Sequence, residues 1–139
     1  MTGQHTGQLV LEDARTNQQY ACYRLAPGQQ FSVGFVHSVN KSPVVDTYQV
    51  EPDGIYVINT VYYGFGAGVQ TELGEGQTLS YGEDGSMIIS GFDQKIEPLV
   101  YTVGTVSDHI LSLKDQQISL RDLCGRNAMV RFRYTCGWW

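Results

Sequence analysis

FSVGFVHSVNKSPVVDTYQV, residues 31–50, is the stretch that most clearly indicates the fold. Apolar and polar side chains alternate along its two arms, Phe31 to Val39 and Val44 to Glu51, as they do in β-strands with one buried face. The residues between the arms, Asn40-Lys41-Ser42-Pro43, suit a hairpin loop. The stretch therefore predicts two antiparallel strands joined by a short connection.

This loop also predicts a register for the hairpin. With residues 40–43 in the loop, Val39 lies opposite Val44, and His37 lies opposite Asp46 one step further in. The next pairs are Phe35 with Tyr48 and Val33 with Val50. Residues two apart on a strand share a face, and most of these pairs are apolar, so this face is expected to pack inward.

The His37–Asp46 pair is the first candidate site. Side chains directly opposite each other are about 5 Å apart at Cβ, so the two could share a hydrogen bond. A carboxylate fixes the tautomer of an imidazole and raises its pKa, as it does around metal-binding and catalytic histidines. The simpler alternative, which we favour, is a half-buried polar pair that only holds the loop.

The same alternation recurs along the rest of the chain, interrupted by Gly, Pro, Asp and Asn. Only Leu120 to Cys124 suits a helical turn. About ten short strands without a long helix predict one all-β domain over residues 1–139, an antiparallel β-sandwich or partly open barrel, with residues 1–8 as a polar, disordered extension. The other predicted strands are Leu9 to Asp13, Gln19 to Leu25, Ile55 to Tyr63, Thr78 to Tyr81, Ser86 to Ser90, Pro98 to Gly104, His109 to Lys114, Ile118 to Leu120 and Ala128 to Cys136.

Composition excludes several classes of function. The net charge of −5 with nine Lys plus Arg argues against a nucleic-acid partner, which requires a basic face. No apolar run is long enough for a membrane span. The polar start lacks the features of a signal peptide, so the protein is either cytoplasmic or has lost an export segment.

Three cysteines are too few for a disulfide scaffold, and no CxxC motif indicates a zinc ribbon. Cys124 and Cys136 could form a disulfide in an oxidising compartment, which would leave Cys22 free. The simpler interpretation is three half-buried thiols that behave as small hydrophobic residues.

Asp108 and His109 form a second polar pair. Asp108 alone suits a turn cap, whereas His109 could join His37 and a carboxylate such as Asp46 or Glu72 at a metal. Nothing in the spacing shows that these side chains converge. We therefore predict no metal and no cofactor, and keep His37, Asp46 and His109 only as secondary metal candidates.

Gly64-Phe65-Gly66-Ala67-Gly68 has the glycines of a phosphate-binding loop, but no helix is predicted after it, as such a loop requires. The glycines more simply allow close backbone approach or let Phe65 lie over the edge of a pocket. A catalytic nucleophile is also missing. There is no G-x-S-x-G motif, and Ser38 faces away from His37 on a strand. The chain is therefore expected not to be an enzyme.

Four blocks of the sequence resemble a bacterial and archaeal family catalogued as domain of unknown function 1850, and the resemblance extends from Leu9 to Tyr134. Asn40 and Val45 stand where the family pattern has acidic residues, and Asp46 replaces a Glu. The resemblance thus supports the His37–Asp46 pair but not a site with several carboxylates. The blocks are His37-Ser38-Val39 with Ser42-Pro43-Val44, Phe65-Gly66-Ala67-Gly68, Gly91-Phe92-Asp93, and Val103-Gly104 through Asp108-His109.

The resemblance implies a location and a partner rather than an activity. Members of the family commonly have an N-terminal hydrophobic export or anchor segment. They are often encoded beside tripartite ATP-independent (TRAP) solute transporters of the TAXI type. The resemblance implies an extracytoplasmic domain, at the cell surface or in the periplasm, whose export segment is absent from this chain. Its partners would be a transporter component and a small-molecule solute.

Three hypotheses about function follow. The leading one is a non-enzymatic binding or accessory module of a TRAP-type transporter. The first alternative is a small hydrolase or metal-dependent enzyme that uses His37, Asp46 and His109. The second alternative is a purely structural interaction domain. The candidate ligand-binding residues are His37, Ser38, Asp46, Phe65, Gly66, Asp108 and His109.

Overall fold

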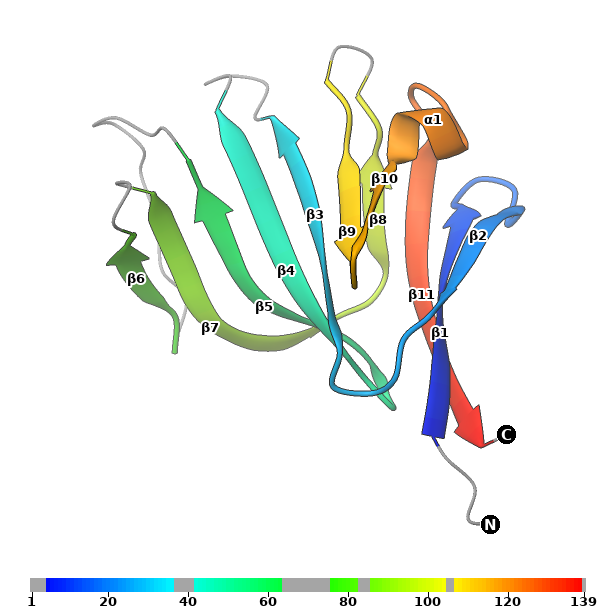
Figure 1. The fold of residues 1–139 in the computed structure, drawn as a ribbon, viewed down its shortest axis with the longest axis horizontal. Coiled ribbons are helices and arrows are strands. Elements are labelled where there is room, and N and C mark those ends of the chain that lie inside the picture. Colours follow the sequence, from blue (N-terminus) through cyan, green and yellow to red (C-terminus); the bar gives the residue numbers. More distant parts are fainter. Residues whose placement is uncertain (1–4, 37–41, 64–75, 83–85, 105–106, 139) are drawn as a thin grey trace.

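The computed structural model describes residues 5–36, 42–63, 76–82, 86–104 and 107–138 (Figure 1). Within these ranges the chain forms β-strands and one short helix. The strands form two antiparallel sheets that do not close into a barrel. The predicted all-β class is confirmed, and the architecture is that of a β-sandwich rather than a barrel.

The smaller sheet contains both ends of the described chain. It has four strands in the order β2-β1-β11-β8. β1 lies beside β11, so segments from opposite ends of the sequence are neighbours in the structure (Figure 1). The bounds are β1 His5–Asp13, β2 Gln19–Arg24, β8 Leu99–Thr102 and β11 Met129–Trp138.

The larger sheet has seven strands in the order β10-β9-β3-β4-β5-β7-β6. The short helix α1, Leu120–Cys124, follows β10 directly, as the sequence predicts. The bounds are β3 Gln30–Val36, β4 Pro43–Glu51, β5 Gly54–Tyr62, β6 Thr78–Tyr81, β7 Met87–Ile96, β9 Ile110–Leu113 and β10 Gln116–Ser119.

Every predicted strand overlaps an observed one, and the largest differences are at two ends. β7 continues to Ile96, past the predicted end at Ser90. β1 begins at His5 rather than Leu9, because residues 5–8 pair with β11 from Trp138 back to Thr135. Residues 5–8 therefore belong to the sheet and not to a disordered extension. Their pairing partner is β11, at the far end of the sequence, so the residues around them do not reveal it.

The predicted register of the first hairpin is wrong. β4 presents Asp46 opposite Val33 and Val44 opposite Phe35, so Asp46 does not lie opposite His37. The shift is four residues along β4 relative to the prediction. Because side chains alternate with period two, an even shift leaves each residue on its predicted face. Residues 37–41, which include His37 and Ser38, lie outside the described residues.

Both sheets contribute to the hydrophobic core cluster of the described residues. Phe31 of β3 stacks on Phe132 of β11, with ring centroids 5.7 Å apart and parallel rings. Tyr48 of β4 also stacks on Phe31, with ring centroids 5.2 Å apart. Face-to-face packing of this kind allows each sheet to bury one face and expose the other.

Candidate functional site

Five polar or titratable side chains meet between the sheets, and we call them the inter-sheet cluster. Asp46 and Tyr48 lie on the inner face of β4, and Thr60 lies opposite Asp46 on β5. Tyr101 comes from β8 in the other sheet, and His109 immediately precedes β9. The cluster therefore lies toward the end of the sandwich where β4 begins and β8 ends, the upper end in Figure 1.

A chain of hydrogen bonds connects the two sheets. The Asp46 carboxylate accepts hydrogen bonds from the Thr60 hydroxyl at 2.8 Å and from the Tyr101 hydroxyl at 2.6 Å. The Tyr48 and Tyr101 hydroxyl oxygens are 2.5 Å apart. Since the one hydroxyl hydrogen of Tyr101 is directed at Asp46, Tyr48 must be the donor in this contact. Both carboxylate oxygens of Asp46 are thus engaged.

Both tyrosines of the cluster are held in their protonated form. Burial raises the pKa of Tyr101, and the nearby negative charge of Asp46 raises it further. The same two causes raise the pKa of Tyr48, outweighing the opposing effect of its hydrogen bond to Tyr101. At neutral pH these hydroxyls are hydrogen-bond donors and are not activated as nucleophiles.

His109 is buried within an aromatic environment, with only 9% of its surface exposed. Its ring stacks on Phe35 at 5.1 Å and meets Tyr101 edge-on at 5.7 Å. Its Nδ1 atom is buried and has no hydrogen-bond partner among the described residues. A buried polar atom without a partner lowers the stability of the fold by about 1–3 kcal/mol, so the unpaired state of Nδ1 requires an explanation.

The imidazole of His109 is neutral at pH 7. Burial lowers its pKa below the ordinary value of 6.5, although the charges of Asp108 and Asp46 act in the opposite direction. Desolvation of the charged form is therefore the stronger effect at this position.

Asp108 has a structural role outside the cluster. Its carboxylate accepts hydrogen bonds from the backbone N–H groups of His109 at 2.7 Å and Arg121 at 2.9 Å, and from the Ser119 hydroxyl. Burial raises the pKa of Asp108, but these bonds outweigh it and lower the pKa overall. Asp108 thus fixes the start of α1 to the segment before β9.

Ser119→Ala is expected to lower the free energy of unfolding by about 1 kcal/mol, because Ser119 caps α1 by accepting a hydrogen bond from the Asp122 N–H. Urea denaturation followed by circular dichroism measures the change. Gln117→Ala, at an exposed position on β10, is the matched control and should stay within about 0.5 kcal/mol of the parent chain. Equal losses for both variants would contradict the capping role.

The structure brings together some of the predicted site residues. Asp46 and His109 belong to one cluster, bridged by Tyr101. The described residues contain no group of three or more His, Cys, Asp and Glu side chains that could hold a metal ion. His37, Ser38, Phe65 and Gly66 lie outside the described residues, so their part in the site stays a prediction.

Sequence reasoning missed three members of the cluster. Tyr48 could have been found, because it lies two residues from Asp46 on the same face of one strand. Thr60 is a polar residue within the strand that the sequence predicts to be central, which is a weaker signal. Tyr101 has no local signal, since its contact with Asp46 depends on how the two sheets pack.

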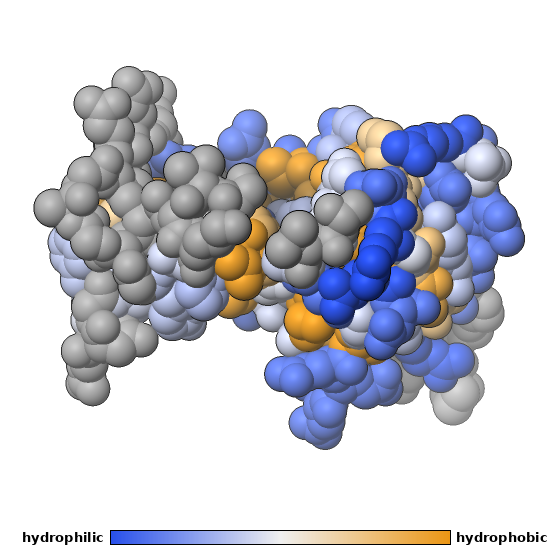
Figure 2. All heavy atoms as spheres, turned by 90° about the horizontal axis from the view of Figure 1, so that it is seen from above, coloured by the Kyte–Doolittle hydropathy of each residue, from blue (hydrophilic) through white to orange (hydrophobic). Residues whose placement is uncertain are grey.

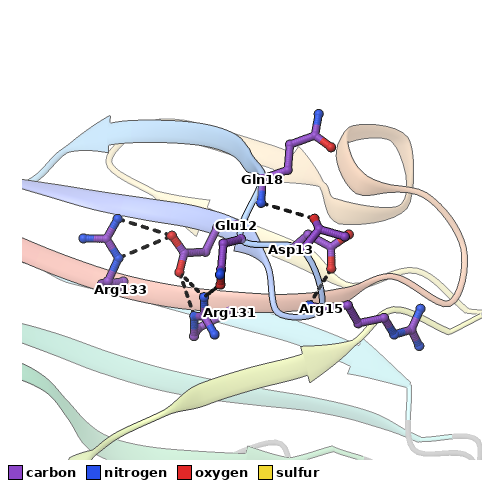
Figure 3. A network of polar contacts seen from close by, with 8 residues as sticks. Glu12, Asp13, Arg15, Gln18, Arg131 and Arg133 are labelled. Atoms are coloured by element: carbon purple, nitrogen blue, oxygen red, sulfur yellow. Dashed lines mark hydrogen bonds and ion pairs between the residues drawn. The ribbon is translucent and has the colours of Figure 1, made fainter.

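A second polar network holds β1 to β11 (Figure 3). Glu12 accepts hydrogen bonds from Arg131 Nε at 2.7 Å and from Arg133 Nη2 at 3.2 Å. Burial raises the pKa of Glu12, but the two guanidinium groups outweigh it and lower the pKa overall. The carboxylate and both arginines satisfy one another, which indicates a structural role.

At the opposite end of the sandwich lies a groove of about 170 Å³. Ile55, Leu99 and Phe132 contribute apolar surface to it, and Lys95 and Glu97 form an ion pair of 3.6 Å at its edge. The groove shares no residue with the inter-sheet cluster. It therefore provides a place for control substitutions that leave the cluster intact.

The cysteines show no reactive arrangement within the part of the chain that is described. Cys22 and Cys124 are free thiols, so Cys124 does not form the disulfide that the sequence left open. Burial raises the pKa of the Cys124 thiol to about 11, which keeps it protonated at neutral pH. Separately, none of the helical structure in the described ranges has the length and apolar character needed to cross a bilayer.

The comparison with known proteins identifies a family. The profile of the domain of unknown function DUF1850 matches residues 31–120. A search of curated proteins and a search of solved structures found no match. The matched range begins at the second residue of β3 and ends at the first residue of α1, and so includes all five residues of the inter-sheet cluster. Since the match covers more than half of the chain, this protein belongs to the DUF1850 family.

Proposed function

We propose that this protein is a non-enzymatic binding or accessory module of a TRAP-type solute transporter and works outside the cytoplasm. The observation that carries the proposal is the state of the inter-sheet cluster. Its carboxylate has both oxygens engaged, and its two tyrosines are kept protonated. Such a site is organised to hold hydrogen-bonding groups in place rather than to activate a nucleophile.

The place of the cluster also supports a binding role. Ser42-Pro43-Val44 leads into β4, Val103-Gly104 follows β8, and Asp108-His109 precedes β9. These are parts of the blocks that carry the family resemblance, and they lie at the same end of the sandwich as the cluster. Viewed from this end, hydrophobic residues reach the surface between hydrophilic ones (Figure 2). Apolar surface combined with a few fixed polar groups is one of the features of small-molecule sites.

A ligand screen tests the proposal. The melting temperature of the chain is measured with succinate, glutamate, Ca²⁺ and Zn²⁺ as probes. At least one of them should raise it, since a ligand at 100 times its Kd stabilises the folded state by about 2.7 kcal/mol. For the Asp46→Asn variant, the melting temperatures with and without the probe should differ less than they do for the parent chain, because the substitution removes the fixed negative charge.

Lys95→Ala, at the edge of the groove at the opposite end, is the matched control and should keep the full ligand shift. Co-purification with a membrane component of a solute transporter tests the accessory role separately. If no probe shifts the melting temperature and no transporter component co-purifies, the proposal is refuted and a purely structural interaction domain is favoured.

A hydrolase or metal-dependent enzyme is the second candidate, because Asp46 and His109 do lie in one cluster. It would require His37 to reach the same place. Hydrolysis of a chromogenic ester that depends on His37 and His109 would favour the enzyme over the binding module.

A further inference from the structure

We infer that the inter-sheet cluster is an acid-sensitive contact, in which protonation of His109 loosens the two sheets from each other at the end where β8 ends and β9 begins. The contact would regulate binding at the inter-sheet cluster, and this role in regulation rests on the proposed function. The conformational change itself requires no ligand. It can therefore be tested on the free chain.

His109 occupies a position that joins the sheets. Its ring is stacked on Phe35 in the seven-stranded sheet and packed against the edge of Tyr101 in the four-stranded sheet. Tyr101 in turn contacts Phe132 of β11 at 5.8 Å and donates to Asp46. A change at His109 therefore acts on the aromatic and polar contacts that connect the sheets at this end.

The folded site suits the neutral imidazole and not the charged one. An imidazolium carries a hydrogen on each nitrogen and needs two acceptors. Nδ1 of His109 is buried and finds no partner within the part of the chain that the structure describes. Protonation would therefore place a charge in an aromatic environment and, at one nitrogen, a donor without an acceptor, both of which are costly when buried.

In the described ranges, the charged groups that face His109 do not supply that acceptor. Asp46 of β4 already accepts from Thr60 and Tyr101 through both oxygens. The carboxylate of Asp108, on the same segment, is held by backbone N–H groups and Ser119, with the positive charge of Arg121 from α1 nearby.

The remaining neighbours of His109 that the structure describes carry no charge. Tyr101 of β8 and, behind it, Tyr48 of β4 keep their protons because their pKa values are raised. β3 contributes the uncharged Phe35. The effect of burial on the pKa of His109 is therefore larger than the opposing effect of the negative charges of Asp108 and Asp46, and the pKa is lowered.

The sign of the pH effect follows from proton linkage. When the contact opens, His109 is solvated and its pKa returns toward 6.5, above the value in the closed state. Between these two values the open state binds the proton more readily. Opening is therefore favoured as the pH falls below about 6.5, and the closed contact is fully favoured above it. The lowered pKa values of Glu12 and Asp108 place their titration at more acidic pH.

Amide hydrogen exchange at about pH 7.5 and about pH 5.5 tests the inference. After correction for intrinsic exchange rates, the opening equilibrium for β3 and β8 should rise by up to about tenfold at the lower pH. The amides that pair β1 with β11 serve as an internal reference and should change less.

His109→Phe is the matched control, because phenylalanine preserves the ring contacts and cannot be protonated. It should abolish the increase, and the comparison also removes contributions from His5 and His37. His109→Gln is a second non-titrating variant in case the first does not fold.

An unchanged exchange equilibrium in the parent chain, or the same increase in the non-titrating variants, would overturn the inference. So would an imidazole of His109 that titrates at 6.5 or above in an NMR titration. These measurements are made without a ligand, so their outcome does not depend on the result of the ligand screen. Conversely, a chain that binds a probe equally well at both pH values would support the proposed function without the acid-sensitive contact.

Discussion

Phe132→Ala should lower the free energy of unfolding by about 3–5 kcal/mol, the largest effect that we expect from a single substitution. Phe132 is 3% exposed, stacks on Phe31 and packs against Tyr101. Removing its ring loses apolar burial and leaves a cavity between the two sheets, which the surrounding strands can fill only in part. Guanidinium denaturation at pH 7.5 measures the loss.

Leu79→Ala on β6 is the control for this substitution. Leu79 is 36% exposed at the edge of the larger sheet, so a similar truncation should cost much less. Comparable losses for the two variants would mean that Phe132 is not part of the packed contact between the sheets. Because Phe132 supports the ring of Tyr101, its truncation should also weaken the binding of any probe found in the ligand screen.

Tyr101→Phe should lower the free energy of unfolding by about 1.5–3 kcal/mol, the second largest effect. The substitution keeps the ring and removes only the hydroxyl. Asp46 loses the hydrogen bond of 2.6 Å to one of its oxygens, and the Tyr48 hydroxyl loses its acceptor. Hydrogen bonds to ionised groups are stronger than those between neutral groups, and a buried polar atom left unpaired adds a desolvation cost.

Tyr81→Phe removes the same hydroxyl from a tyrosine that is 69% exposed on β6, and it should be neutral within about 0.5 kcal/mol. A double-mutant cycle with Tyr48→Phe separates the two hydrogen bonds. If the hydroxyls act as one chain, the losses of the two single variants will not add. Full additivity, or a Tyr101→Phe loss no larger than that of Tyr81→Phe, would contradict the proposed chain of hydrogen bonds.

The candidate site shows which functional residues can be identified from the sequence before the fold is known. Asp46 stands out in the sequence because it is a carboxylate on the predicted inner face of the hairpin, and His109 because it lies in a family-like block. Their convergence could not be derived, since it is made by Tyr101, whose strand lies in the other sheet. The contacts of Asp108 with Ser119 and Arg121 also join separate segments of the chain, so they too depend on the fold.

The hairpin illustrates the same limit within a single motif. Alternation with period two assigned Val33, Phe35 and Asp46 to one face, and that assignment holds. The pairing was wrong by four residues, because an even shift preserves every face and so leaves the hydrophobic pattern unchanged. Only the length of the connection between the strands sets the register, and the apolar pattern carries no information about it.

By itself the sequence determined the strands of this protein, the buried face of the first hairpin, and the helical turn at Leu120–Cys124, because these follow from local periodicity and turn chemistry. The tertiary structure decided which strands are neighbours, how β1 meets β11, and which side chains from the two sheets touch. Those contacts depend on the packing of residues far apart in the chain. The inter-sheet cluster, where Tyr101 meets Asp46 and His109, is formed only by this packing of distant residues.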